Sequence, residues 1–253
     1  MRILLTNDDG IFAPGLTALY KRLKELGEVM VVAPTDCWSG ASHTITFSEP
    51  LVCHKTEVDG LFTGFSIEGS PADCVKLASM QLHDGPIDLV VAGINPGANV
   101  GINVYYSGTV AAAIEAAFLK IPSVAVSVAA EEEIDFDKAA EYGVDVLRRL
   151  LPLCRGDVTN VNIPRVSGGE PKGIRVVPQA TSGFYEYYIP HRQGDSETFF
   201  QLAGGAHREE QNPADTTTLA EGYITVTPLR PDMTDHRKTA ALRARFEGEL
   251  GQP

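Results

Sequence analysis

Two adjacent carboxylates, Asp8 and Asp9, follow the first apolar run of the chain, residues 3–5. This run predicts a buried strand, so the acid pair lies just beyond the carboxyl end of that strand. In an open α/β sheet, ligands bind outside the carboxyl ends of the strands. Carboxylate oxygens are ligands that hard cations prefer. Asn, Asp and Gly are also common turn residues, so segment 1–10 alone fits a metal site or a solvated turn.

Two further apolar strands also end in polar, glycine-containing loops. Ser39 lies in the loop after the second strand, and Asn95 ends the third. Either residue alone could be an ordinary turn residue. Because the carboxyl ends of parallel strands share one edge of a sheet, we expect both side chains beside the acid pair. This all-oxygen set suits Mg²⁺ or Mn²⁺, whereas zinc prefers His and Cys.

Ser107, Gly108 and Thr109 precede an alanine-rich helix at 110–119. Free backbone N–H groups at a helix N-terminus bind phosphate, and the glycine allows close approach. Plain N-capping by either hydroxyl residue is an equally good interpretation of this segment alone. Beside a metal site, the segment predicts phosphate binding. Together the two features indicate metal-assisted hydrolysis of a phosphate ester.

Three other polar residues are close in sequence to the predicted ligands. We expect Asn7, His43 and Asn99 to surround the metal site as hydrogen-bonding neighbours of the ligands. His43, four residues after Ser39, could also act as a general acid or be an ordinary loop histidine.

Alternating apolar segments define the expected core, 1–164. Strands are predicted at 3–5, 29–33, 89–94, 123–128 and 158–163, and helices at 16–26, 71–82, 110–119 and 134–151. Segments 44–52 and 62–67 are expected to be exposed or hairpin strands. Strands that alternate with helices predict an α/β fold, a parallel sheet with helices on both faces.

The pattern changes after residue 164. Short strands at 174–177, 183–189 and 223–227, separated by polar loops, predict an irregular β extension over 165–230. Segment 232–250 ends in a charged helix and belongs to an expected C-terminal tail, 231–253. Its apolar residues Leu242 and Phe246 lie on one face, and so short a helix must dock on something to be stable.

Composition excludes several classes of partner. The net charge of −12 over 253 residues disfavours binding to a nucleic-acid duplex, although a small phosphorylated substrate remains compatible. No apolar stretch is long enough to span a membrane, and no secretory signal is evident. The four cysteines match no zinc or redox spacing. We therefore expect a cytoplasmic protein with reduced thiols.

Seven segments, in this order, resemble the SurE family of survival-protein nucleotidases: 3–10, 39–43, 69–74, 93–101, 106–113, 121–127 and 222–229. The resemblance implies a Rossmann-like core, a β-hairpin extension and a C-terminal element exchanged between the subunits of a homodimer or homotetramer.

The resemblance also implies an activity and its residues. The expected reaction is hydrolysis of nucleoside 5′- and 3′-monophosphates to nucleoside and phosphate, with one divalent cation per subunit. The implied metal ligands are Asp8, Asp9, Ser39 and Asn95, of which the two acids and the asparagine are expected to be catalytic, and the implied phosphate loop is Ser107, Gly108 and Thr109. The alternatives are a broader phosphomonoesterase or exopolyphosphatase, and a nucleotide-binding sensor without turnover.

Overall fold

A computed structural model describes residues 1–83, 85–193, 197–207 and 213–247, and within them a nine-stranded sheet forms the core. Its five central strands run parallel, in the order β2 (Glu28–Pro34), β1 (Arg2–Thr6), β5 (Leu89–Pro96), β6 (Ser123–Val128) and β7 (Val158–Ile163). Central strands of a parallel sheet are covered on both faces, which explains the mainly apolar sequences of β1, β2, β5 and β6. The predicted parallel α/β core is confirmed.

Antiparallel pairs occur toward both edges of the sheet. At one edge β4 (Phe62–Ile67) is parallel to β2, and β3 (Cys53–Val58) is antiparallel to β4. At the other edge β11 (Ile224–Leu229) is antiparallel to β7, and β8 (Ile174–Val176) is parallel to β11. Part of the segment 165–230 therefore continues the core sheet.

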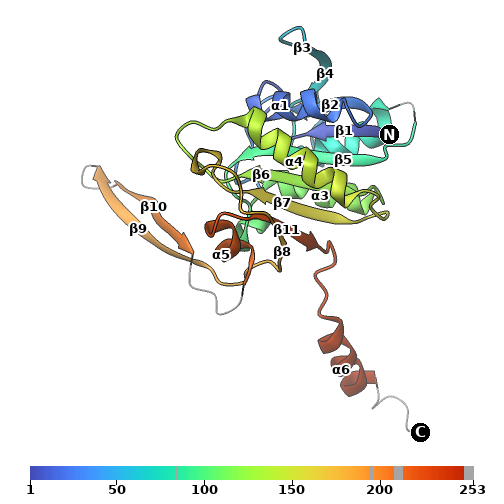
Figure 1. Cartoon of the computed structure of the whole chain (residues 1–253). Coiled ribbons are helices and arrows are strands. Elements are labelled where there is room, and N and C mark those ends of the chain that lie inside the picture. The colour runs from blue at the N-terminus through green and yellow to red at the C-terminus, as the bar shows by residue number, and fades with distance from the viewer. Residues whose placement is uncertain (84, 194–196, 208–212, 248–253) are drawn as a thin grey trace.

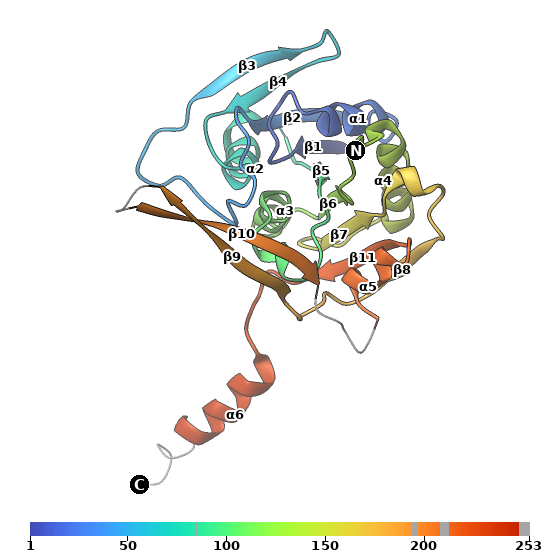
Figure 2. The same ribbon diagram turned by 90° about the vertical axis from the view of Figure 1, so that its left-hand side faces the viewer.

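Helices cover both faces of the sheet. α1 (Pro14–Leu23) and α4 (Phe136–Leu150) lie on one face, and α2 (Pro71–Leu77) and α3 (Gly108–Phe118) on the other (Figures 1 and 2). Short helical turns are η1 (Ala78–Leu82), which continues α2, η2 (Gly101–Tyr105) and η3 (Val166–Gly168). Side-chain caps begin three of the main helices: Ser70 at α2, Ser107 at α3 and Asp135 at α4.

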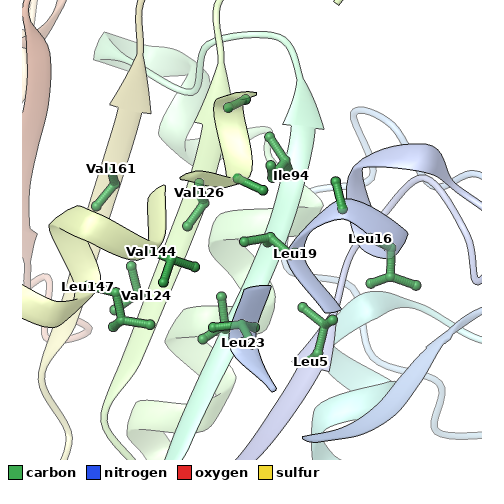
Figure 3. Packing of buried hydrophobic residues seen from close by; sticks show 14 of the residues in the cluster. Leu5, Leu16, Leu19, Leu23, Ile94, Val124, Val126, Val144, Leu147 and Val161 are labelled. Carbon is green, nitrogen blue, oxygen red and sulfur yellow. The ribbon is translucent and has the colours of Figure 1, made fainter. Parts of the chain in front are cut away.

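The largest apolar cluster lies between the sheet and the pair α1 and α4 (Figure 3). Leu16, Leu19 and Leu23 recur on one face of α1 and are fully buried. From α4, Val144 and Leu147 pack toward the same side of the sheet. Close packing of this kind holds the strands in place and so fixes the positions of the loops at their carboxyl ends.

The strand predicted at 44–52 is wrong, because this segment is an irregular loop. The first residues of the segment bond to the start of α2. Thr46 donates from its backbone N–H and its hydroxyl to the Asp73 carboxylate at 3.0 and 2.8 Å. The Ser70 hydroxyl donates to the Thr44 carbonyl at 2.6 Å. These long-range contacts override the local preference of the segment for a strand.

The C-terminal third contains a projecting hairpin and a tail. β9 (Phe184–Gln193) and β10 (Glu197–His207) form the antiparallel hairpin, and α5 (Asp215–Ala220) follows it. The predicted strand 183–189 corresponds to β9, whereas β10 and α5 have no counterpart in the prediction. α6 (His236–Glu247) is the charged helix expected within 232–250, and residues 248–250 of that segment lie outside the described residues.

The tail extends away from the core in both views (Figures 1 and 2). No residue of α6 is buried. In the part of the chain that the structure describes, no helix has both the length and the apolar character that crossing a membrane requires. The division into a core, an extension and a tail stays a prediction.

Candidate metal and phosphate site

A small cavity of about 230 Å³ opens at the carboxyl ends of β1, β2 and β5. These strands are neighbours in the sheet. All four predicted metal ligands line the cavity: Asp8, Asp9, Ser39 and Asn95. The other lining residues are Gly40, Pro96, Asn99, Asn103, Tyr106 and Ser107. The fold thus brings the predicted ligands together with one residue of the predicted phosphate loop.

A tight turn presents the acid pair. The Asn7 side chain donates to the Gly10 carbonyl at 2.9 Å and accepts from the Gly10 backbone N–H at 3.2 Å. Gly10 has φ +103°, a conformation that favours glycine. The Trp38 backbone N–H donates to the Asp8 carbonyl at 2.7 Å and ties the Ser39 loop to this turn. Asn7 therefore shapes the loop that carries the acids.

Asp8 is almost fully buried and is held by the start of α3. Its Oδ1 accepts a short hydrogen bond from the Thr109 hydroxyl. Burial raises the pKa of Asp8, and hydrogen bonds from the side chain and backbone of Thr109 and from the backbone of Gly108 oppose this rise only in part. The first turn of α3 fixes the orientation of this carboxylate.

Asp9 lies beside it without a compensating partner. Burial, and then the charge of Asp8, raise the pKa of Asp9 to about 7. Its buried Oδ2 has no hydrogen-bond partner among the described residues. Within the same residues, no Lys, Arg or His forms an ion pair with Asp8 or Asp9. A buried carboxylate beside a half-buried one, without a cation, is costly, and a divalent cation would neutralise both.

The two neutral residues of the set add oxygen donors. Asn95 donates from Nδ2 to the Gly97 carbonyl at 2.6 Å, which leaves its Oδ1 as a ligand atom. The Ser39 hydroxyl lies 3.1 Å from the Cys37 sulfur. No cluster of three or more His, Cys, Asp or Glu suited to a metal occurs in the described residues. The donor chemistry fits a hard cation with mixed carboxylate and neutral oxygen ligands.

The three residues of the predicted phosphate loop have different surroundings. Ser107 lines the cavity and caps α3, accepting from the Val110 backbone N–H at 3.1 Å. Gly108 packs so closely on the acid loop that an added Cβ would lie 2.8 Å from Asp8 Cβ. Thr109 is fully buried behind Asp8. Of the three, Ser107 faces the cavity, and the other two support Asp8.

Comparison with known proteins identifies the family of this chain. The family model described as "Survival protein SurE" matches residues 3–186. The chain belongs to the SurE family. A 5′-nucleotidase SurE from Rhodopirellula baltica is 44% identical over 238 residues, which cover 92% of this chain and 94% of that protein. One from Syntrophus aciditrophicus is 39% identical over 253 residues, covering 98% and 95%.

A solved structure supports the same assignment. The crystal structure of the SurE protein from Aquifex aeolicus matches with a TM-score of 0.84 at 36% identity, covering 97% of this chain and 99% of that one. The similarity therefore extends over the SurE core and the C-terminal third alike.

His43 of this SurE chain does not line the metal cavity. Its Nε2 lies 2.9 Å from Glu115 Oε2, and Lys76 Nζ lies 2.8 Å from the other oxygen of Glu115. Glu115 is buried in α3. The predicted place of His43 around the metal therefore differs from its observed contacts, which join the Ser39 loop to α3.

Asn99, in contrast, is held at the cavity by residues that are absent from the predicted site. Its backbone N–H donates to Asn162 Oδ1 at 2.8 Å, and its carbonyl accepts from Asn160 Nδ2 at 2.7 Å. Its Nδ2 donates to the Ser127 hydroxyl at 2.9 Å. Two buried asparagines on alternate positions of a fully buried strand, β7, were the available signal.

Proposed function

We propose that this SurE protein is a divalent-metal-dependent phosphatase that hydrolyses nucleoside 5′- and 3′-monophosphates to nucleoside and phosphate. The observation that carries the proposal is the pair of buried Asp8 and half-buried Asp9, which has no cationic partner among the described residues and lies in a cavity whose other predicted ligands are neutral oxygens. The names of the relatives, 5′-nucleotidase SurE, support the nucleotide substrate.

Asp8, Asp9, Ser39 and Asn95 would hold one cation per subunit, Mg²⁺ or Mn²⁺. When bound there, the cation supplies Lewis acidity toward a phosphoryl oxygen and orients the reacting groups. The Thr109 hydroxyl and the start of α3 keep Asp8 in one orientation. Asn7 keeps both acids on the same turn.

Ser107 is the residue of the predicted loop that we expect to contact the phosphate. Its hydroxyl accepts from the Val110 backbone and retains its own proton, which can be donated to a phosphate oxygen in the cavity. Gly108 and Thr109 act on the phosphate through Asp8. This division of roles refines the expectation that all three residues bind phosphate directly.

The protein is further proposed to assemble as a homodimer or homotetramer in the cytoplasm. Leu242 and Phe246 on α6 are 43% and 65% exposed, and no residue of α6 is buried. Such a helix gains stability by docking on another subunit. The four cysteines are free thiols, which suits a reducing compartment.

A panel of phosphate esters tests the proposed function. The wild-type protein is assayed for phosphate release from nucleoside 5′- and 3′-monophosphates, p-nitrophenyl phosphate and short polyphosphate, each with Mg²⁺, Mn²⁺ or EDTA. The proposal expects the highest kcat/KM on a nucleoside monophosphate and no turnover in EDTA. Preference for p-nitrophenyl phosphate or polyphosphate would indicate the broader phosphatase, and absence of turnover on every ester would indicate a binding protein.

A further inference from the structure

A second, larger cavity of about 730 Å³ adjoins the metal cavity. Tyr106 and Ser107 line both cavities and so form their common wall. The metal cavity, at about 230 Å³, is smaller than ordinary small-molecule sites, which occupy roughly 300–1,000 Å³. It can take a phosphate and a cation. The adjoining cavity falls within the range for a whole organic ligand.

The larger cavity follows one face of α3. Ser107, Ala111, Ile114 and Phe118 all line it, and their spacing places them on the same side of a helix. At 1.5 Å per residue, Phe118 lies roughly 16 Å along the axis from Ser107. Side chains on a helix tilt toward its N-terminus, which brings Phe118 closer to the metal cavity. A ligand with a phosphate at Ser107 would therefore extend along α3 toward Phe118.

Aromatic surfaces stand around this cavity. Tyr105, Tyr106 and Phe118 line it and are 54%, 56% and 54% exposed. The His43 ring lies nearly parallel to the Phe118 ring, with centroids 5.7 Å apart and an interplanar angle of 16°. Exposed, flat aromatic faces are the surfaces on which nucleobases stack.

A buried carboxylate fixes the His43 ring. Burial opposes the ionisation of Glu115, but hydrogen bonds from His43 and Lys76 outweigh it and lower the pKa of Glu115. An ionised carboxylate only accepts, so His43 donates from Nε2. Its Nδ1 is left for other partners. The ring is thus held on Phe118 by a contact that no ligand has to supply.

We propose that this cavity binds the nucleoside half of the substrate, with the base stacked on the surface formed by Phe118 and His43. The inference rests on the proposed function, because it places the phosphate of the same molecule at Ser107. Binding through stacking tolerates different bases, since every base has a flat π-face.

The test compares two phosphate esters that differ only in the alcohol bonded to the phosphate, a nucleoside in one and ethanol in the other. The ratio of kcat/KM for adenosine 5′-monophosphate to kcat/KM for ethyl phosphate is measured in Phe118→Ala. Loss of a base–aromatic stack, worth about 1–3 kcal/mol, should lower this ratio by roughly 5- to 150-fold. Phe47→Ala is the matched control, because Phe47 is 91% exposed and lines neither cavity. It should keep the wild-type ratio.

Adenosine binding, measured by calorimetry, separates this inference from the proposed function. Wild type should bind adenosine, and Phe118→Ala should bind it at least fivefold more weakly. Adenosine binding that depends on Phe118, in a protein that hydrolyses no ester, would support the cavity and sink the proposed function. Hydrolysis of both esters with an unchanged ratio in Phe118→Ala, or no adenosine binding by wild type, would overturn the cavity assignment.

Discussion

Gly108→Ala should cripple the enzyme with little effect on folding. Ordinary carbon–carbon contacts lie at about 3.5–4.0 Å, and the new Cβ would be 2.8 Å from Asp8 Cβ and 3.0 Å from its Oδ2. Asp8 must therefore retreat by at least about 0.7 Å. A displacement near 1 Å in an active site can cost about 100-fold in rate, so we expect kcat/KM to fall by that order.

The stability cost is expected to be small. Overpacking costs about 1–3 kcal/mol, and replacing a helical glycine by alanine returns about 1 kcal/mol. The net loss of roughly 0–2 kcal/mol corresponds to a Tm decrease of up to about 8 °C.

The assay is phosphate release from adenosine 5′-monophosphate at several Mn²⁺ concentrations, with thermal melts of the same samples. Gly168→Ala is the matched control, because its Cβ would meet nothing within 4 Å. If the displacement acts through Asp8, the variant also needs more Mn²⁺ for half-maximal activity. A Gly108→Ala enzyme within threefold of wild-type kcat/KM would refute the role of this close contact.

Three further predictions follow from the same contacts. In metal-free protein, burial raises the pKa of Asp9 from 3.8 to about 7, so its ionisation opposes folding. The stability of wild type relative to Asp9→Asn should be highest below about pH 4 and should fall as the pH rises through 7. Thermal melts of both proteins in EDTA measure this, and a difference in Tm that does not change with pH would contradict the prediction. Thr109→Val should lower kcat by loosening Asp8, whereas Ser107→Ala should mainly raise KM. If steady-state kinetics show the reverse pattern, Thr109 contacts the phosphate and Ser107 supports the acid pair, which contradicts the prediction. A chain that ends after residue 235 lacks α6 and should shift toward monomer in light scattering, and an intact chain that is already monomeric at micromolar concentration would exclude exchange of this helix.

The sequence predicts the core of the fold well, because most of the central strands are short apolar runs between polar loops. It also places Asp8, Ser39 and Asn95 together, since each follows a different strand of one parallel sheet. Both predictions depend on local patterns combined with one rule of sheet geometry.

The features that sequence patterns did not reveal depend on contacts between distant segments. Segment 44–52 bonds to the cap of α2, 26 or more residues away, and does not form the expected strand. Thr109 donates to Asp8 across 101 positions. Asn160 and Asn162 lie in β7, and the sequence does not show that their side chains bind the backbone of Asn99. The assignment of side chains as direct ligands or as supports therefore required the three-dimensional arrangement.

The most direct test of a cation held by the acid pair is a Mn²⁺ titration of chelator-treated protein, followed by calorimetry and by phosphate release in the same samples. Wild type should bind one Mn²⁺ per chain, and turnover of adenosine 5′-monophosphate should rise in step with occupancy. Asp8→Asn should keep its fold, because little packing is lost, and should lose several orders of magnitude in activity at limiting Mn²⁺. Full activity of wild type in excess EDTA, or near-wild-type turnover by Asp8→Asn at limiting metal, would contradict the account.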